Sequence, residues 1–212
     1  MTISLLEVFD IAGTIAFAIS GSYVGIRRDM DIFGIMVLAV TTACGGGMIR
    51  DLVMGRIPPV MFMHPMFVLI AVITAAIVFI VAKRKRIFPR NMVSIYDHVM
   101  FWFDTFGLAA FTVDGVMAGI NKGYSDHAFM MIFLGLITGV GGGLLRDVLA
   151  GQVPYIFVKH VYAVASIAGA ACMTILYRMT GRWQLSMIVG AAVVVVLRFL
   201  ASHFEWDLPK VN

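Results

Sequence analysis

The sequence predicts an all-α, polytopic membrane protein with seven transmembrane helices, arranged as an inverted repeat of three plus three helices and one C-terminal helix. Three observations predict this fold. The chain is 61% hydrophobic and only 13% charged, whereas a soluble domain carries about 25% charged residues. Its apolar residues form seven runs, each long enough to cross a bilayer. Finally, a glycine-rich motif occurs twice along the chain.

The seven runs, taken in chain order, cover residues 5–26, 32–54, 60–82, 98–119, 127–150, 155–177 and 183–203. Each is close to the roughly 20 residues that a transmembrane helix needs. The connection at 83–97 begins with Lys83-Arg84-Lys85-Arg86 and also holds Arg90. Because cytoplasmic loops are enriched in Lys and Arg, we expect this linker and the C-terminus inside and the N-terminus outside. Most of the basic residues behind the net charge of +4 lie in short connections between apolar runs, so they indicate topology, and we expect no nucleic-acid partner.

The motif GGGxxRDxxxGxxP occupies residues 45–58 and again 141–154, which are 96 positions apart. Asp10 matches Asp104 at an offset of 94, and His64 matches His160 at an offset of 96. Residues 5–82 and 98–177 are thus two copies of a three-span unit within one membrane domain, 1–212, and the helix at 183–203 stands outside the repeat. Because three is odd, the second copy enters the membrane from the opposite side. Inverted repeats are typical of transport proteins, whose sites lie near the midplane between the halves.

The glycine triplets lie within the second and fifth runs, and two interpretations of them remain open. Three glycines in a row weaken a helix, so the backbone there is expected to bend or unwind and to offer carbonyl oxygens to a cation. Alternatively, the glycines let neighbouring helices approach closely. Under the first interpretation, the candidate residues of an ion pathway are Thr42, Gly45, Gly46, Gly47, Thr138, Gly141, Gly142 and Gly143.

Charged side chains next to these triplets also have two interpretations. Charges at this depth are costly, and they usually pair with one another or line water. They either stabilise helix ends and pair across the repeats, or they line the pathway. Gly55 and Gly151 are expected to end their helices, and Pro58 and Pro154 to precede the next ones. The charged candidates are Asp10, Arg50, Asp51, Asp104, Asp114, Arg146 and Asp147.

Enzymatic chemistry has little support in the sequence. Cys44 and Cys172 both lie in apolar runs and are expected to be buried small side chains. His64 and His160 lack an evident third ligand, so we expect no metal site. No serine–histidine–acid arrangement and no phosphate-binding loop stands out. We therefore expect a protein that is not an enzyme, with no catalytic residues and no cofactor, apart from permeant K⁺ or Na⁺.

Together these residues resemble those of a known family. The doubled glycine motif, the stretch Arg27-Arg28-Asp29-x-Asp31-x-Phe33-Gly34 and the late segments Leu197-Arg198-x-Leu200-Ala201 and Trp206-x-Leu208-Pro209 resemble bacterial TRIC-type proteins. These are prokaryotic relatives of the trimeric intracellular cation channels. The resemblance implies a homotrimer in the bacterial or archaeal cell membrane, with a potassium-conducting pore in each subunit lined by the second and fifth helices. Some bacterial relatives are described as glycine transporters, so a small-solute carrier is the alternative.

Overall fold

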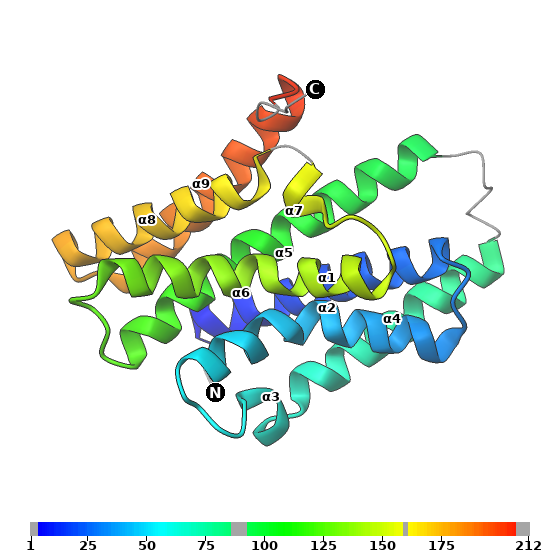
Figure 1. Cartoon of the computed structure of the whole chain (residues 1–212), viewed down its shortest axis with the longest axis horizontal. Coiled ribbons are helices and arrows are strands. Elements are labelled where there is room, and N and C mark those ends of the chain that lie inside the picture. The colour runs from blue at the N-terminus through cyan, green and yellow to red at the C-terminus, as the bar shows by residue number, and fades with distance from the viewer. Residues whose placement is uncertain (1–3, 86–92, 159–160, 207–212) are drawn as a thin grey trace.

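The computed structural model describes residues 4–85, 93–158 and 161–206, which are helical apart from short connections (Figure 1). Seven helices in this part of the chain are long and apolar enough to span a membrane, as the sequence predicts. The first repeat holds α1 (Leu5–Arg27), α2 (Ile32–Val53), α3 (Val60–Met63) and α4 (Met66–Lys85). The second holds α5 (Val93–Asn121), α6 (Ala128–Leu149), α7 (Tyr155–Val158) and α8 (Tyr162–Thr180), and α9 (Trp183–His203) follows.

The third span of each repeat differs from the sequence prediction. The runs at 60–82 and 155–177 each contain a short helix before the long one, namely α3 before α4 and α7 before α8. Pro65 separates α3 from α4, because proline has no N–H to continue the helical hydrogen bonding. Val161, with a φ of 45°, immediately precedes α8. His64 is exposed at the first of these junctions, and its repeat mate His160 lies outside the described residues.

Both glycine motifs end their helices as predicted. Gly55 and Gly151 have positive φ values of 69° and 64°, a conformation that glycine adopts without a steric penalty. At each end, two backbone N–H groups turn back onto the last helical turn, including Arg56 N to the Asp51 carbonyl at 2.8 Å and Gln152 N to the Asp147 carbonyl at 3.0 Å. This is the Schellman arrangement, which satisfies carbonyls that a helix otherwise leaves free.

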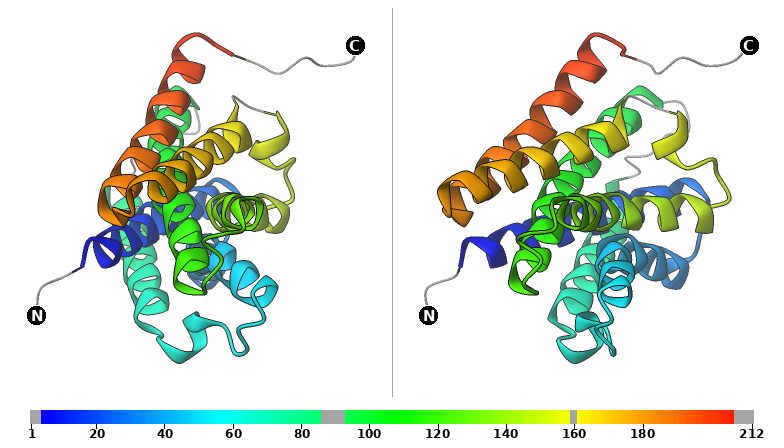
Figure 2. Two further views of the ribbon diagram at one scale, coloured as in Figure 1. Left: turned by 90° about the vertical axis from the view of Figure 1, so that its left-hand side faces the viewer. Right: turned by 60° about the vertical axis from the view of Figure 1, so that its left-hand side comes forward.

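Helices α2 and α6, the same helix in the two repeats, pack against each other at the centre of the molecule. Helices α1 and α5 also pack against each other across the repeats. Helix α4 covers the first repeat, while α8 and α9 cover the second, so the added ninth helix makes the two halves unequal (Figures 1 and 2). The first two long helices of each repeat, α1, α2, α5 and α6, therefore form the centre of the molecule.

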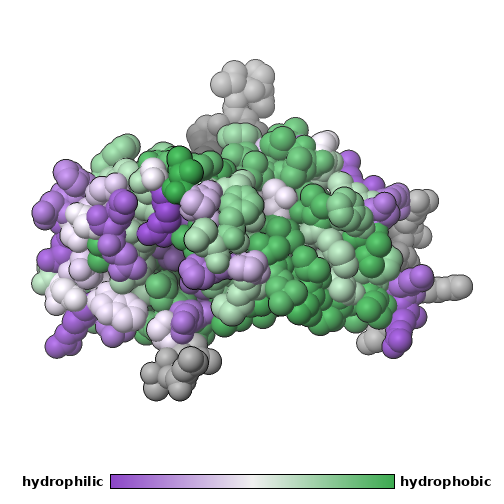
Figure 3. All heavy atoms as spheres, turned by 90° about the horizontal axis from the view of Figure 1, so that it is seen from below, coloured by the Kyte–Doolittle hydropathy of each residue, from purple (hydrophilic) through white to green (hydrophobic). Residues whose placement is uncertain are grey.

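On the face shown in Figure 3, hydrophobic side chains cover much of the middle, and hydrophilic side chains gather toward the two ends of the long axis. Helix α4 is an example, because Leu69, Ile73, Ile77 and Ile80 are all exposed at helical spacing. A soluble protein would bury such a face, whereas a membrane solvates it. The long axis therefore follows the direction in which the helices cross the bilayer.

The glycine triplets do not interrupt their helices, which corrects the expectation that the backbone unwinds there. Helix α2 is continuous from Ile32 to Val53, and α6 is continuous from Ala128 to Leu149. The physical reason is the crossing itself. A Cβ on Gly46 would lie 2.2 Å from the carbonyl oxygen of Thr138, and a Cβ on Gly142 would lie 2.0 Å from that of Thr42. The close-approach interpretation therefore explains these glycines, and their backbone groups stay in helical hydrogen bonds.

Candidate functional site

Each arginine–aspartate pair that follows a glycine triplet fastens the end of one helix to the start of the next. Arg50 Nε donates to Asp51 Oδ1 at 3.0 Å, and the other oxygen of Asp51 accepts from Val60 N at 2.9 Å. In the second repeat, Arg146 Nε donates to Asp147 Oδ1 at 2.8 Å, and Asp147 Oδ2 accepts from Tyr155 N at 2.8 Å. The two aspartates thus use both oxygens in structural contacts at the starts of α3 and α7.

Both arginines also reach the first helix of the opposite repeat. Arg50 Nη1 donates to Asp114 on α5. Arg146 Nη1 lies 2.5 Å from Ser20 Oγ on α1 and 2.5 Å from Asp104 Oδ1 on α5. Asp114 and Ser20 are repeat mates at the offset of 94, so the two cross-repeat contacts are equivalent in position but different in charge.

These contacts define two clusters. The α2-end cluster consists of Asp10, Arg50, Asp51 and Asp114. It borders a cavity of about 110 Å³ that Thr14, Cys44 and Gly47 also line. The remaining lining is apolar and includes Val60, Met61, Phe67 and Phe111, so the charged side chains form one side of the cavity, which we call the polar cavity. A cavity of this volume with polar groups in its lining has room for water.

The α6-end cluster consists of Ser20, Asp104, Arg146, Asp147, Tyr162 and Arg198, and it is sealed. Arg146 and Arg198 are both fully buried, with no exposed side-chain surface. The Arg198 guanidinium lies 4.8 Å from the centres of both the Phe101 ring and the Tyr162 ring, a cation–π arrangement. A Cβ on Gly143 would lie 3.2 Å from the Tyr162 hydroxyl, so Tyr162 fills the space beside the glycine.

Most of the predicted pathway residues lie in the packed crossing of α2 and α6. Thr42 and Thr138 are buried, and each hydroxyl donates to the carbonyl four residues earlier at 2.6 Å. A Cβ on Gly45 would lie 2.6 Å from Leu145 Cδ1, and one on Gly141 would lie 3.0 Å from the Cα of Gly46. Gly47 differs from these residues because it borders the polar cavity.

Sequence reasoning did not select Ser20, Tyr162 or Arg198 as site residues. Arg198 carried a signal, since an arginine within an apolar span usually pairs or lines water. Ser20 and Tyr162 carried none, because a serine or a tyrosine in an apolar run has no distinctive pattern. Their roles depend on which helices meet, and this is visible only in the folded chain.

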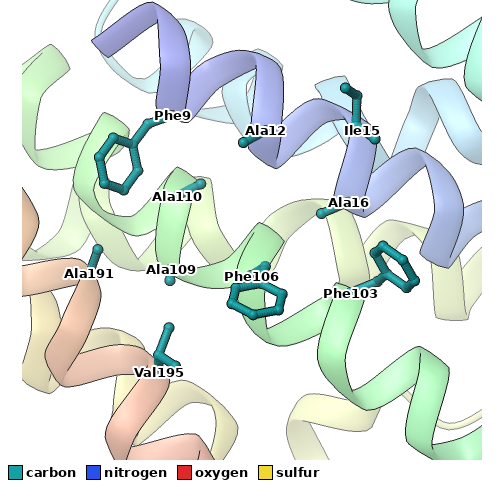
Figure 4. Close-up of a pocket in the computed structure, with 10 residues that line it drawn as sticks. All are labelled: Phe9, Ala12, Ile15, Ala16, Phe103, Phe106, Ala109, Ala110, Ala191 and Val195. Atoms are coloured by element: carbon teal, nitrogen blue, oxygen red, sulfur yellow. The ribbon is translucent and has the colours of Figure 1, made fainter. Parts of the chain in front are cut away.

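A second, larger cavity of about 410 Å³ lies between α1, α5 and α9. Figure 4 shows its lining of alanine, phenylalanine, isoleucine and valine side chains, with no polar group among them. An ion would lose its hydration there without compensation. This cavity is therefore unsuited to an ion pathway, and the polar cavity at the end of α2 is the better candidate.

Within the described residues, no group of three or more histidine, cysteine, aspartate or glutamate side chains is placed to hold a metal ion. Four of their carboxylates, those of Asp51, Asp104, Asp114 and Asp147, are instead paired with arginine. The arrangement supports the passage or binding of small polar solutes, since it places charged groups and a polar cavity within the membrane-spanning helices.

Comparison with known proteins agrees with the geometry. The sequence model of the family described as "Glycine transporter" matches residues 7–83 and 101–178, so each matched segment falls within one repeat. The chain is 34% identical over 203 residues to the inner membrane protein YadS of Escherichia coli K12, covering 94% of this chain and 93% of that protein. It is 31% identical to the membrane protein YvgT of Bacillus subtilis 168, covering 96% and 95%.

Solved structures of similar proteins are cation channels. A TRIC trimeric intracellular cation channel orthologue from Rhodobacter sphaeroides is 30% identical, with a TM-score of 0.86, and the match covers 96% of this chain and all of that one. A structure described in connection with conductance through TRIC cation channels is 28% identical, with a TM-score of 0.83 and coverage of 99% and 98%. A worm channel with bound Ca²⁺, at 13% identity and a TM-score of 0.62, shares the fold.

The relatives that carry a functional description are channels or transporters and not enzymes. Family model, full-length relatives and structures agree over nearly the whole chain. The chain therefore belongs to the bacterial TRIC-type membrane protein family, whose sequence model is described as "Glycine transporter".

Proposed function

We propose that the protein is a monovalent cation channel, with one pathway in each subunit that runs between α2 and α6 from the polar cavity to the α6-end cluster. The observation that carries this proposal is the charge of the cavity. The lining holds three acidic side chains, those of Asp10, Asp51 and Asp114, and a single guanidinium, that of Arg50, so acidic groups outnumber basic ones. Such a site attracts cations and repels anions.

The arrangement corresponds to a closed channel. Tyr162 and Arg198 fill the α6 end, and the crossing at Gly46 and Gly142 leaves no room for an ion between the two backbones. Opening on this proposal separates α2 from α6 and moves Tyr162 away from Gly143. The similarity to structures of TRIC cation channels supports the same activity.

Planar-bilayer recording of the purified protein tests the proposal. We expect unitary currents that reverse near the potassium equilibrium potential when a K⁺ salt is present at unequal concentrations on the two sides. With K⁺ on one side and Na⁺ on the other, the reversal potential then gives the selectivity, for which we propose a preference for K⁺. Stable, folded protein that never carries cation current contradicts the proposal.

A glycine carrier is the second candidate, because the family model is described as "Glycine transporter" and the cavity holds both signs of charge. Arg50 suits a carboxylate and Asp10 suits an ammonium group, so the cavity matches the charges of a zwitterion. Uptake of labelled glycine into proteoliposomes separates the two candidates. Saturable uptake that is accelerated by glycine on the opposite side supports the carrier.

We further propose a homotrimer in the bacterial inner membrane, with the N-terminus outside and the C-terminus in the cytoplasm. The relatives support the first two points, since they include an inner membrane protein and trimeric channels. The basic stretch that begins at Lys83 supports the orientation. Mass measurement in native membranes tests the trimer, and reporter fusions at the C-terminus test the orientation.

A further inference from the structure

Asp10 and its repeat mate Asp104 have different surroundings. Asp104 accepts from Arg146 Nη1 at 2.5 Å, so a cation of the protein lies beside its carboxylate. Arg50 is the repeat mate of Arg146, yet its Nη1 pairs with Asp114. Among the described residues, Asp10 Oδ1 and Asp104 Oδ2 are both buried without a hydrogen-bond partner, so the ion pair with arginine is what distinguishes Asp104. A buried carboxylate oxygen without a partner is costly, so a cation beside Asp10 would offset a real penalty.

One sequence difference between the repeats explains this contrast. Position 114 is aspartate, whereas its repeat mate at position 20 is serine. A carboxylate at 114 holds Arg50 by charge, while the neutral Ser20 leaves Arg146 free to contact Asp104 as well. The arginine of the glycine motif therefore pairs with Asp104 in the second repeat, whereas its counterpart in the first repeat pairs with Asp114 and not with Asp10.

The net charges of the clusters differ accordingly. The α6-end cluster holds two carboxylates, Asp104 and Asp147, and two guanidinium groups, Arg146 and Arg198, which sum to zero. The α2-end cluster holds three carboxyl groups and one guanidinium, which sum to −2 with all three carboxyl groups ionised and to −1 with Asp10 neutral. Only the α2-end cluster borders the polar cavity of about 110 Å³. The excess negative charge and the space for a partly hydrated ion thus occur together.

We propose that this cavity is a binding site for a monovalent alkali cation, in which Asp10 and Asp114 supply carboxylate oxygens, and that the serine at position 20 leaves the opposite end without such a site. Thr14, which is 2% exposed, also lines the cavity and offers a hydroxyl oxygen. Oxygen ligands of this kind replace the hydration shell of an alkali ion. The inference rests on the proposed cation channel and places an ion site at the α2 end of its pathway only.

Cys44 gives a direct measurement, because it lines the same cavity. In a Cys172→Ala background, it is the only cysteine in the chain. The rate at which it reacts with methyl methanethiosulfonate, a small neutral reagent, is followed in lipid nanodiscs while K⁺ replaces N-methylglucamine at constant ionic strength. N-methylglucamine is a bulky organic cation and serves as the reference.

We expect K⁺ to slow the reaction saturably, and by mass action the rate falls about fourfold at three times the dissociation constant if bound K⁺ blocks the thiol. Asp10→Asn removes a ligand and should abolish the dependence on K⁺. Asp114→Ser copies position 20 and should release Arg50 to Asp10, which fills the site with a cation of the protein. Asp126→Asn, which neutralises an exposed carboxylate outside the cavity, should leave the protection unchanged.

Three results overturn the proposal: equal rates in K⁺ and N-methylglucamine, a thiol that never reacts, and full protection in the Asp10→Asn protein. The same preparations are assayed for K⁺ flux in liposomes, so that the two proposals fail separately. Flux without protection refutes the ion site and retains the channel. Protection without flux retains the site and refutes the channel. Protection by glycine but not by K⁺ refutes the cation site and favours the carrier.

Discussion

Replacing glycines within one triplet should have opposite effects on stability, because neighbouring positions face different surroundings. A Cβ on Gly46 would lie 2.2 Å from the Thr138 carbonyl oxygen, about 1.2 Å short of the 3.4 Å at which ordinary contact begins. A Cβ on Gly47 would meet nothing closer than Arg50 Nη2 at 3.6 Å. The substitutions Gly46→Ala and Gly47→Ala therefore form a matched pair.

The magnitudes decide the sign of each effect. Alanine is favoured over glycine in a helix interior by about 1 kcal/mol, so Gly47→Ala should be neutral or stabilising by up to that amount. Gly46→Ala gains the same term, but overpacking costs about 1–3 kcal/mol. The upper end applies, because the obstacle is a backbone carbonyl of α6 that cannot rotate away. The net loss is then about 2 kcal/mol, which corresponds to a fall in Tm of about 4–8 °C for a chain of this size.

The assay is thermal unfolding of the detergent-solubilised protein, followed by the fraction that remains monodisperse after heating. Gly142→Ala should resemble Gly46→Ala, since its Cβ would lie 2.0 Å from the Thr42 carbonyl oxygen. If Gly46→Ala and Gly47→Ala have the same Tm, or if Gly46→Ala is the more stable, then close approach is not the reason for these glycines.

Three further predictions concern the clusters. Arg146→Gln leaves Asp104 and Asp147 buried without their cation and should cost about 3–5 kcal/mol; the measured Tm should partly recover in the double variant Arg146→Gln/Asp104→Asn, and no recovery contradicts the pairing. Tyr162→Phe keeps the ring beside Arg198 but removes the hydroxyl beside Gly143, so on the channel proposal it should raise the open probability in single-channel records; an unchanged open probability argues against a seal at this tyrosine. Asp10→Asn removes one negative charge from the cavity and should lower the unitary K⁺ conductance more at low salt than at high salt; an equal reduction at all salt concentrations excludes an electrostatic role.

The sequence predicted the spans well because their signal is local. A run of about 20 apolar residues needs no knowledge of its neighbours, and the last span, 183–203, matches α9 residue for residue. The glycine terminators Gly55 and Gly151 were equally local, since the positive φ belongs to the residue itself. Pro65 was the local signal for the division between α3 and α4, and the prediction of one continuous run overlooked it.

The triplets were harder to interpret, because the same three glycines serve an unwound helix and a close crossing equally well. What distinguishes the two is the backbone on the other side, and Thr138 lies 92 positions from Gly46 in the chain. The prediction of freed carbonyls was wrong for this reason. The arginine–aspartate pairs were ambiguous in the same way until Val60 and Tyr155 provided their backbone N–H groups.

If the protein is a channel as proposed, the continuous crossing of α2 and α6 indicates that the resistance to opening lies at the ends of these helices. Gly46 and Gly142 place backbone against backbone, so moving α2 relative to α6 there breaks no side-chain hydrogen bond. At the α6 end, the same movement separates Arg146 from Ser20, a contact between the two repeats whose hydrogen bond is charge-assisted. At the α2 end, it separates Arg50 from Asp114, a partly exposed pair that water can solvate once it parts. Separating a buried charge pair costs far more free energy than separating a pair that water can solvate. The α6 end should therefore control opening, while the α2 end stays accessible to cations.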